Sequence, residues 1–263
     1  MGRLERLAKM DKQSNPPMQS DRPALARGLF VARLGWWPLL LAGVFLLGTA
    51  VALPLDGYCA GWLGGHRPPP PVRKLLQLSE LFGHGIGILL IGLVIFQLDV
   101  ARRWAVPRVL LAALGAGIVA DIVKVLVARV RPRYCGLESS VGQVVHGWFV
   151  VAGEGKSQSF PSGHAAAAVA LALALAALYP RGKWLFAALA FSACWQRLDE
   201  AAHFPSDLLL GAAIGSLVAA ACVCRSPLAS LFDRREAQLR SLAAAWRRRF
   251  SPAGRLPGSG TPA

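Results

Sequence analysis

Hydrophobic residues in this chain gather into long runs that short polar segments separate. Six runs approach the length of about 20 residues that a helix needs to cross a bilayer. They cover residues 34–53, 81–98, 109–127, 165–178, 184–195 and 208–224. The fourth and fifth runs are short, so each must borrow flanking residues to cross. Because lipid admits only helices and closed barrels, the pattern predicts an all-α bundle of six transmembrane helices. Buried helices of a soluble protein are the alternative for the short alanine-rich runs.

Composition agrees with a membrane protein, since 54% of the 263 residues are hydrophobic and only 16% are charged. Residues 1–33 are polar and predict a disordered cytoplasmic tail, and residues 34–224 form the membrane domain. Residues 225–263 form a basic tail, in which hydrophobic residues between 228 and 250 recur at near-helical spacing with arginines between them. That spacing predicts an amphipathic helix on the cytoplasmic leaflet, where anionic lipid attracts it. The net charge of +15 fits this interpretation, and nucleic-acid binding is not expected.

Lys and Arg residues predict the orientation, because cytoplasmic loops carry an excess of them. Four segments are rich in them: those before the first run, between the second and third, between the fourth and fifth, and after the last. All four lie on one side if there are six spans. We therefore expect a multi-pass protein of the bacterial inner membrane with both termini in the cytoplasm. Arg67, Arg73 and Lys74 argue mildly against this, because they would lie outside.

The end of the first run leaves one processing question open. Ala50-Val51-Ala52 resembles a signal-peptidase site, although the preceding polar region is long for a signal peptide. The other five spans keep their orientation in either case.

Three short polar blocks lie where hydrophobic runs meet water, and alternating spans bring all three to the outer face. The blocks are Lys124 with Arg131-Pro132, then Pro161-Ser162-Gly163-His164, then Arg197 with His203 and Asp207. They supply three cations, two imidazoles, a hydroxyl and a carboxylate. Because Arg and Lys both bind phosphate oxygens, this set is suited to binding and transferring a phosphoryl group.

Spacing within the first two blocks suggests how they would bind an anion. Lys124 and Arg131 are seven residues apart, so they share a face if the helix continues to Pro132. Gly163 lets the backbone approach an anion closely, and the helix that follows directs free N–H groups at it. Ser162 can cap that helix or donate to phosphate.

The third block supplies a nucleophile. An imidazole attacks phosphorus only if one ring nitrogen is unprotonated, and a carboxylate on the other nitrogen fixes that tautomer. Asp207 follows His203 by four residues, although Pro205 argues against a regular helix between them. His164 is the candidate acid for the leaving oxygen. The structural alternatives are cations that snorkel to the interface and histidines that only pack.

In this order, and separated by hydrophobic helices, the motifs Lys-x6-Arg-Pro, Pro-Ser-Gly-His and Arg-x5-His-x3-Asp resemble the signature of the type 2 phosphatidic acid phosphatases. The resemblance covers roughly residues 109–223, and the first two spans match only in general architecture. It implies that His203 forms a phosphohistidine, that Asp207 orients it and that His164 protonates the leaving group. It also implies that phosphate is bound without a metal ion or other cofactor. The residues implied in that binding are Lys124, Arg131, Ser162, Gly163 and Arg197.

One residue departs from the family's pattern. Gln196 stands before Arg197 where the family usually has Ser, and its amide can donate to phosphate or to a neighbouring loop. The soluble vanadium haloperoxidases share these motifs, but six apolar spans argue against that relative.

Several polar residues outside the blocks have open roles. Asp121 is expected to bind a neighbouring helix or, alternatively, to tune Lys124. Glu80 and His84, near the start of the second span, are candidates for contact with substrate. Cys59 and Cys135 would lie outside, where an oxidising compartment permits a disulfide.

An outward-facing site at the lipid boundary implies an amphiphilic substrate whose phosphate rests at the interface. Phosphatidic acid, phosphatidylglycerol phosphate, undecaprenyl diphosphate and lipid A phosphates all fit, and in a bacterium undecaprenyl diphosphate or another periplasmic lipid phosphate is favoured. Two alternatives stay open: a phosphotransferase that passes the phosphoryl group to another lipid, and a non-enzymatic lipid-phosphate carrier. A carrier would be indicated by loss of His203, His164 or Asp207, and none is lost. The sequence does not predict an oligomeric state.

Overall fold

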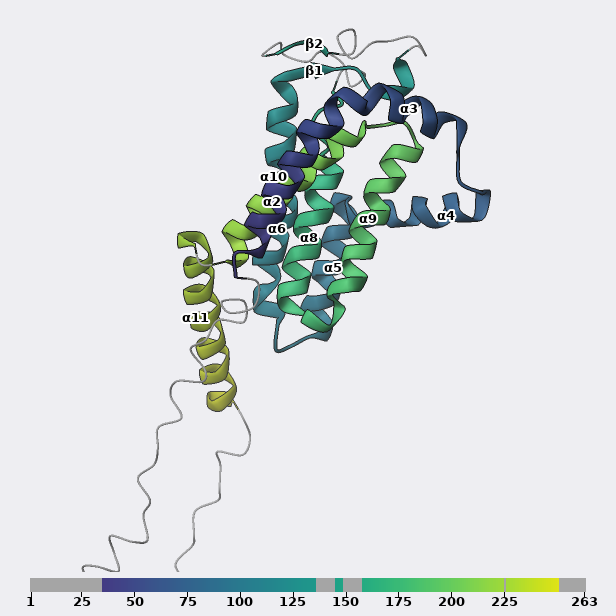
Figure 1. Ribbon diagram of the computed structural model, residues 1–263. Coiled ribbons are helices and arrows are strands. Elements are labelled where there is room, and N and C mark those ends of the chain that lie inside the picture. The colour runs from purple at the N-terminus through teal and green to yellow at the C-terminus, as the bar shows by residue number, and fades with distance from the viewer. Residues whose placement is uncertain (1–34, 136–144, 149–157, 225, 251–263) are drawn as a thin grey trace, which may run out of the picture.

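The computed structural model describes residues 35–135, 145–148, 158–224 and 226–250, which form a helical bundle with a small sheet at one end (Figure 1). The α-helices are α2 (Trp37–Ala52), α3 (Asp56–Gly65), α4 (Pro70–Ser79), α5 (Gly85–Leu98), α6 (Val106–Val125), α8 (Gly163–Leu178), α9 (Lys183–Asp199), α10 (Pro205–Val223) and α11 (Pro227–Phe250). Short 3-10 turns are η1 (Leu53–Leu55), η2 (Glu80–Phe82), η3 (Arg103–Ala105), η4 (Pro132–Tyr134) and η6 (Pro180–Gly182). The strands are β1 (Val127–Arg129) and β2 (Val145–Trp148).

Each of the six predicted runs has a helix at its centre. Three helical segments are long and apolar enough to cross a membrane: Trp37–Gly65, Arg103–Val125 and Pro205–Val223. A fourth span results if Pro70–Phe82 and Gly85–Leu98, which meet at a bend of 69°, count as one. The described residues therefore support a membrane bundle, and the count of six spans stays a prediction.

The protein is mostly helical, as predicted, but the third helix does not continue to Pro132, the condition under which Lys124 and Arg131 would share a helix face. α6 ends at Val125, and the chain then forms β1, which pairs antiparallel with β2 through Val127 and Trp148 and through Ala128 and Gly147. Valines recur through this segment, and β-branched residues favour a strand over a helix. The change of structure carries the chain away from the axis of α6 before it reaches Arg131.

α10 lies at the centre of the bundle, packed against α2, α6 and α8. Gly211 and Gly215 of α10 face α8 so closely that a Cβ on either glycine would overlap a backbone oxygen, that of Ser162 or Ala166 respectively. Small residues four apart let two helix backbones approach in this way. The contact places the second polar block, at the start of α8, against the third block, at the start of α10.

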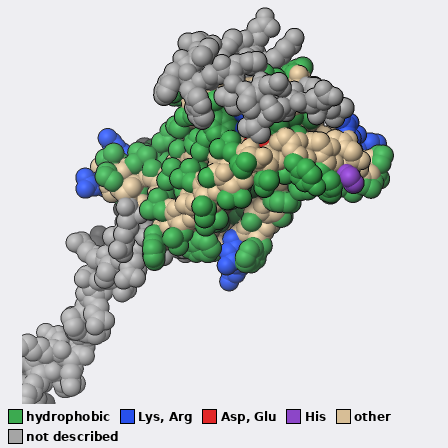
Figure 2. Space-filling model, turned by 45° about the horizontal axis from the view of Figure 1, so that its top comes forward, with side chains coloured by type: hydrophobic (Ala, Val, Ile, Leu, Met, Phe, Trp, Pro, Cys, Tyr) green, Lys and Arg blue, Asp and Glu red, His purple; other side chains and the backbone are tan. Residues whose placement is uncertain are grey.

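The outer surface of the bundle is apolar. Exposed side chains of α2, α5 and α6 are largely Leu, Ile and Val, for example Leu47, Leu90 and Ile122. Figure 2 shows hydrophobic side chains over most of the described surface in that view, with Lys and Arg at its margins. Monomeric soluble proteins rarely expose apolar surface on this scale, so the bundle is suited to lipid.

α4 runs across the bundle instead of along it (Figure 1). Its Leu75 and Leu78 are exposed, while Arg73 Nε lies 3.0 Å from Asp199 Oδ2 at the end of α9. One of the basic residues that argued against the expected orientation therefore has an acidic partner within the protein.

The basic tail contains a helix where the sequence predicts one, and α11 lies at the end of the bundle opposite β1 and β2 (Figure 1). Part of its polar face is turned toward the bundle. Arg108, fully buried in α6, forms ion pairs with Asp233 Oδ1 at 2.6 Å and with Glu236 Oε1 at 2.9 Å. Leu242 and Trp246 stay exposed, and contact with anionic lipid is still a prediction.

Candidate active site

One pocket of about 510 Å³ at the β1–β2 end of the bundle gathers most of the predicted site residues. Six of the eight line it: Lys124, Arg131, Gly163, His164, Arg197 and His203. Asp121 and His84 also line it, and its apolar wall includes Ile88, Leu114, Ile118 and Ala167. Ser162 and Asp207 do not line the pocket. Polar groups from helices far apart in the sequence thus converge beside an apolar surface.

Unsatisfied donors mark the polar end of the pocket as an anion site. Of the residues that line the pocket, Arg131 and His164 each have a buried nitrogen without a hydrogen-bond partner, Nε and Nε2 respectively. Burial, followed by the neighbouring Arg133 and Arg197 guanidinium groups, lowers the pKa of Arg131. Buried polar groups without partners are uncommon in folded proteins. A bound oxyanion would supply acceptors and relieve the repulsion between the cations.

Lys124 reaches the pocket from the last turn of α6, and Arg131 reaches it from the turn after β1. The two share a pocket, therefore, but not a helix face. Lys124 Nζ lies 2.6 Å from Asp121 Oδ1, which favours the alternative that Asp121 tunes Lys124 over contact with a neighbouring helix. A Cβ on Gly163 would come within 2.9 Å of the same carboxylate oxygen, so a side chain at this position would displace Asp121.

Arg197 is held by three acceptors on one side. Its Nη2 lies 2.8 Å from both Glu80 Oε1 and Glu200 Oε2, and its Nε donates to Gln196 Oε1 at 2.6 Å. Gln196 is buried, and its Nε2 donates to Glu80 Oε2 at 3.4 Å. Gln196, which departs from the family's pattern, thus binds Arg197 and Glu80 and does not line the pocket.

His164, the candidate general acid, lies in the first turn of α8. Its Nε2 is 3.8 Å from Glu80 Oε1, and its ring is tilted against that of His84 with 5.9 Å between centroids. His84 Nδ1 accepts from the Ile86 N–H at 3.3 Å, which leaves the proton of a neutral ring on Nε2. Glu80 and His84, which the sequence left as candidates for substrate contact, thus flank the imidazole of the candidate general acid.

His203, the candidate nucleophile, is buried just before α10. Its Nδ1 lies 2.7 Å from the Ser159 carbonyl oxygen and 3.6 Å from Asp207 Oδ2. Because a carbonyl only accepts, Nδ1 carries the proton and Nε2 keeps its lone pair. Burial lowers the pKa of His203, opposed by Asp207, so the ring is neutral near pH 7. The ring has the tautomer that nucleophilic attack requires.

Asp207 lies in the first turn of α10, which begins with Pro205 at a position where proline is favoured. Its carboxylate is fully buried and accepts from the Phe204 N–H at 2.7 Å and from Ser159 Oγ at 2.5 Å. Arg129 Nη1 completes its contacts at 2.5 Å. Asp207 therefore holds the segment that positions His203, and the Ser159 carbonyl makes the shorter contact to the ring.

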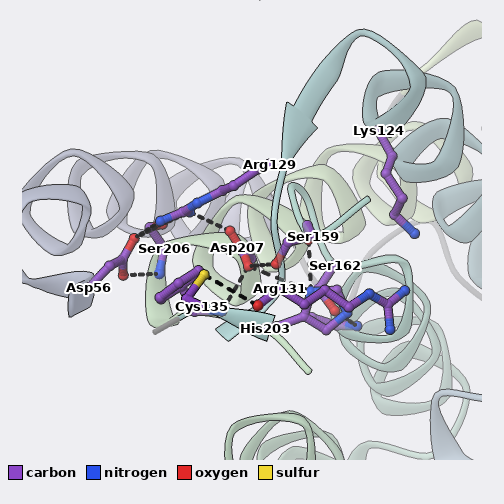
Figure 3. A network of polar contacts seen from close by, with 12 residues as sticks. Asp56, Lys124, Arg129, Arg131, Cys135, Ser159, Ser162, His203, Ser206 and Asp207 are labelled. Atoms are coloured by element: carbon purple, nitrogen blue, oxygen red, sulfur yellow. Dashed lines mark hydrogen bonds and ion pairs between the residues drawn. The ribbon is translucent and has the colours of Figure 1, made fainter. Parts of the chain in front are cut away.

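Sequence reasoning missed four residues of this buried network, namely Asp56, Arg129, Ser159 and Ser206 (Figure 3). Two signals for them exist in the sequence. Arg129 lies inside the first polar block, two residues before Arg131, and Asp56 is a lone carboxylate directly after the first hydrophobic run.

Ser162 is fully buried and caps α8, since its Oγ accepts from the Ala165 N–H at 3.4 Å. Its own N–H donates to the Asp207 carbonyl oxygen at 3.0 Å. These contacts favour the capping alternative over donation to phosphate.

Cys59 and Cys135 are both free thiols in this structure. Cys135 Sγ donates to the Arg131 carbonyl oxygen at 3.4 Å. The disulfide that the sequence permits is therefore not formed here.

Comparisons with known proteins identify relatives of this chain. Two relatives are each named lipid A 1-phosphatase. The protein from Rhizobium johnstonii is 28% identical over 173 residues, which are 59% of this chain and 68% of the relative. The protein from Rhizobium etli is 28% identical over 193 residues, which are 66% of this chain and 79% of the relative.

A solved structure shares the fold. It is the crystal structure of the first transmembrane PAP2 type phosphatidylglycerolphosphate phosphatase from Bacillus subtilis, with a TM-score of 0.52 and 19% identity. The match covers 70% of this chain and 92% of that one.

Residues 105–229 match the PAP2 superfamily, and this segment holds all three polar blocks. Over this segment, which is just under half of the 263 residues, the chain is similar to the PAP2 superfamily.

Proposed function

We propose that the protein is an integral membrane phosphatase that removes phosphate from a membrane lipid through a phosphohistidine at His203. One observation carries the proposal: a single pocket joins three cations and the paired imidazoles of His164 and His203 to an apolar wall. Ile118 in that wall is 59% exposed on the outer surface, so the pocket is continuous with the lipid-facing side of α6. An amphiphile can place its phosphate at the polar end and its tail along this wall.

The reaction follows from the positions of the side chains. Lys124, Arg131 and Arg197 bind the phosphate oxygens and balance their charge, while the lone pair of His203 Nε2 attacks phosphorus. The bond from phosphorus to the lipid oxygen breaks, and His164 gives that oxygen a proton. The neutral His164 then takes a proton from water, which attacks the phosphohistidine and releases phosphate.

The relatives support a glycolipid phosphate of the lipid A type as the first substrate to test, ahead of undecaprenyl diphosphate. Both lipid A 1-phosphatases align with most of their own length and share 28% of aligned residues with this chain. Phosphatidylglycerol phosphate and phosphatidic acid follow.

The distribution of charge supports an orientation with the site in the periplasm and both termini in the cytoplasm. Arg102 and Arg103 precede α6, and Arg181 and Lys183 precede or begin α9, at the end of the bundle away from the pocket. α11 with its arginines extends from that same end (Figure 1). Basic loops are retained on the cytoplasmic side.

The test is phosphate release by protein purified in detergent, with EDTA present, from lipid A, phosphatidylglycerol phosphate, phosphatidic acid and undecaprenyl diphosphate. We expect release from at least one lipid and none from His203→Ala. His66→Ala is the matched control, because His66 stacks on Trp62 and does not line the pocket. No release from any lipid by the wild type would refute the proposal. Transfer of labelled phosphate to a second lipid, with little free phosphate, would establish the phosphotransferase instead.

A further inference from the structure

A cluster of buried charges lies behind His203, and one of its members lies outside the segment that matches the PAP2 superfamily. Asp56 is the first residue of α3, whereas the match begins at residue 105. Arg129 is the last residue of β1. Their side chains are 1% and 2% exposed, and neither lines the pocket. The cluster is separate from the groups that would touch phosphate.

The guanidinium group of Arg129 bridges two carboxylates (Figure 3). Nη1 lies 2.5 Å from Asp207 Oδ1, and Nη2 lies 2.6 Å from Asp56 Oδ2. Ser206 joins the same groups, because its Oγ accepts from Arg129 at 2.8 Å and donates to Asp56, while its N–H donates to Asp56 Oδ1 at 3.1 Å. The Phe204 ring stacks against the guanidinium group, with 4.2 Å between the ring centroid and Arg129 Cζ. α3, β1 and the start of α10 are thereby fixed to one another.

The fixed segment is the one that orients the nucleophile. Ser159 donates its hydroxyl to Asp207 and offers its carbonyl oxygen to His203 Nδ1. The Ser159 N–H in turn donates to the Arg129 carbonyl oxygen at 2.9 Å. A shift of Arg129 would therefore reach the His203 ring by two routes. One is the backbone of Ser159, and the other is the carboxylate of Asp207.

Charge gives the cluster a second effect. It contains one cation and two carboxylates, so with both carboxylates ionised it is negative by one unit beside a neutral His203. Arg129 alone would cancel the charge of Asp207, and Asp56 restores it. In a site shielded from water, a residual negative charge stabilises a positive imidazolium more than it would in solution.

We propose that Asp56 and Arg129 are positioning residues for phosphoryl transfer, which hold Asp207 and Ser159 against His203 and keep a negative charge next to its ring. The inference rests on the proposed role of His203 as the nucleophile. When Nε2 bonds to phosphorus, the bond to the lipid oxygen breaks and His164 protonates that oxygen. The ring is left positive, and its Nδ1–H still donates a hydrogen bond to the Ser159 carbonyl oxygen.

Asp56→Asn tests the charge, because the amide keeps an acceptor for Ser206 and removes the negative charge. We expect kcat to fall by about 10- to 100-fold, as for other residues that orient a reacting group, with KM changed less than about twofold. We expect the acid limb of the profile of kcat/KM against pH to move to lower pH, because His203 loses a stabilising negative charge. Lys124, Arg131, Arg197, His164 and Asp207 also face His203, and they are unchanged in this variant.

A transition-state analogue separates positioning from simple phosphate binding. We expect Asp56→Asn to weaken inhibition by orthovanadate by about the same factor as kcat, since such analogues report transition-state affinity. Inhibition by inorganic phosphate should change less than about twofold, because its cationic ligands are intact.

Arg129→Lys is the second variant, and it carries the test if Asp56→Asn does not fold. A single ammonium keeps the charge but loses the planar fork that reaches two carboxylates. We expect kcat to fall by about tenfold or more with the acid limb unmoved. Arg108→Met is the matched control, since Arg108 is also a buried arginine between two carboxylates but lies at the opposite end of α6. It should lower the unfolding temperature and leave the pH profile unchanged.

The outcomes distinguish the two proposals. Loss of all activity in the wild type would refute the proposed function itself. An active wild type together with a folded Asp56→Asn variant that keeps the wild-type kcat and acid limb would overturn only the positioning role. Wild-type kcat in Arg129→Lys would overturn it as well.

Discussion

Glu80 Oε1 lies 2.8 Å from Arg197 Nη2, so a carboxylate forms an ion pair with the cation that would bind the phosphate of the substrate. Glu80 also lies 3.8 Å from His164 Nε2. Its charge has opposite consequences for the two partners. It competes with phosphate for Arg197. At His164 it opposes burial and the neighbouring Arg197 cation, which lower the pKa of this imidazole, and so would help it keep the proton that the proposed reaction gives to the leaving group.

Glu80→Gln should therefore separate binding from chemistry. We expect KM and the inhibition constant of inorganic phosphate to fall about threefold to tenfold, corresponding to about 1 kcal/mol for one partly buried ion pair. We expect kcat to fall as well, because His164 loses the nearest negative charge. Steady-state kinetics in detergent measures both.

Glu200→Gln is the control for this prediction, because Glu200 binds the same nitrogen of Arg197, whereas Glu80 also lies 3.8 Å from His164. A rise in KM in Glu80→Gln would show that Glu80 positions Arg197 instead of competing for it.

Removing the acid should expose the covalent intermediate. With an aryl phosphate, whose leaving group needs no proton, His164→Ala should still form the phosphohistidine but hydrolyse it about 100- to 10,000-fold more slowly, since the same imidazole activates water. Mass spectrometry of the rapidly quenched protein should find the phosphate on His203.

His203→Ala is the negative control for that measurement, because it removes the proposed nucleophile and leaves Lys124, Arg131 and Arg197 in place. Phosphate bound covalently at any other residue would contradict the assignment.

The pH dependence of the wild type follows from the burial of His203. Burial lowers the pKa of this imidazole, so the nucleophilic neutral form persists at a pH where an exposed histidine is protonated. In a profile of kcat/KM against pH, we expect the midpoint of the acid limb to lie below the usual histidine pKa of about 6.5. A series of buffers of constant ionic strength measures it, and an acid limb above about pH 7 would contradict the neutral ring.

Close helix packing predicts a large difference between two glycine substitutions. A Cβ on Gly215 would overlap the Ala166 carbonyl oxygen, whereas a Cβ on Gly43 would meet nothing within 4 Å. We expect Gly215→Ala to destabilise the bundle by about 1–3 kcal/mol and to lower activity, because it separates α8 from α10. Gly43→Ala should leave both near the wild-type value. Thermal unfolding in detergent and phosphate release measure the two effects.

Hydrophobic runs and polar blocks predict much of this molecule, because both are recorded locally in the chain. A run of apolar residues predicts a helix that can lie in lipid, and each of the six runs has a helix at its centre. The three polar blocks predict which residues gather in the pocket, since six of the eight candidate residues taken from them line it.

Contacts between distant segments could not be predicted in the same way. The end of α6 at Val125 depends on pairing of β1 with β2, a strand 16 or more residues further along the chain. The orientation of His203 depends on a backbone carbonyl, that of Ser159, and a carbonyl carries no mark in a sequence. Asp56 could not be singled out from the sequence, because its partner Arg129 becomes its neighbour only when the helices pack.

The contact of Gly211 and Gly215 with α8 has a consequence for how a lipid reaches the site. Two helices whose backbones touch cannot slide or part without losing that contact along its length, so His164 and His203 belong to one rigid unit. Another part of the pocket wall is formed by Gly83, His84 and Gly85, which lie at the bend between η2 and α5. We expect the pocket to open and close by movement of that wall, while the nucleophile and the acid keep their separation through the whole catalytic cycle.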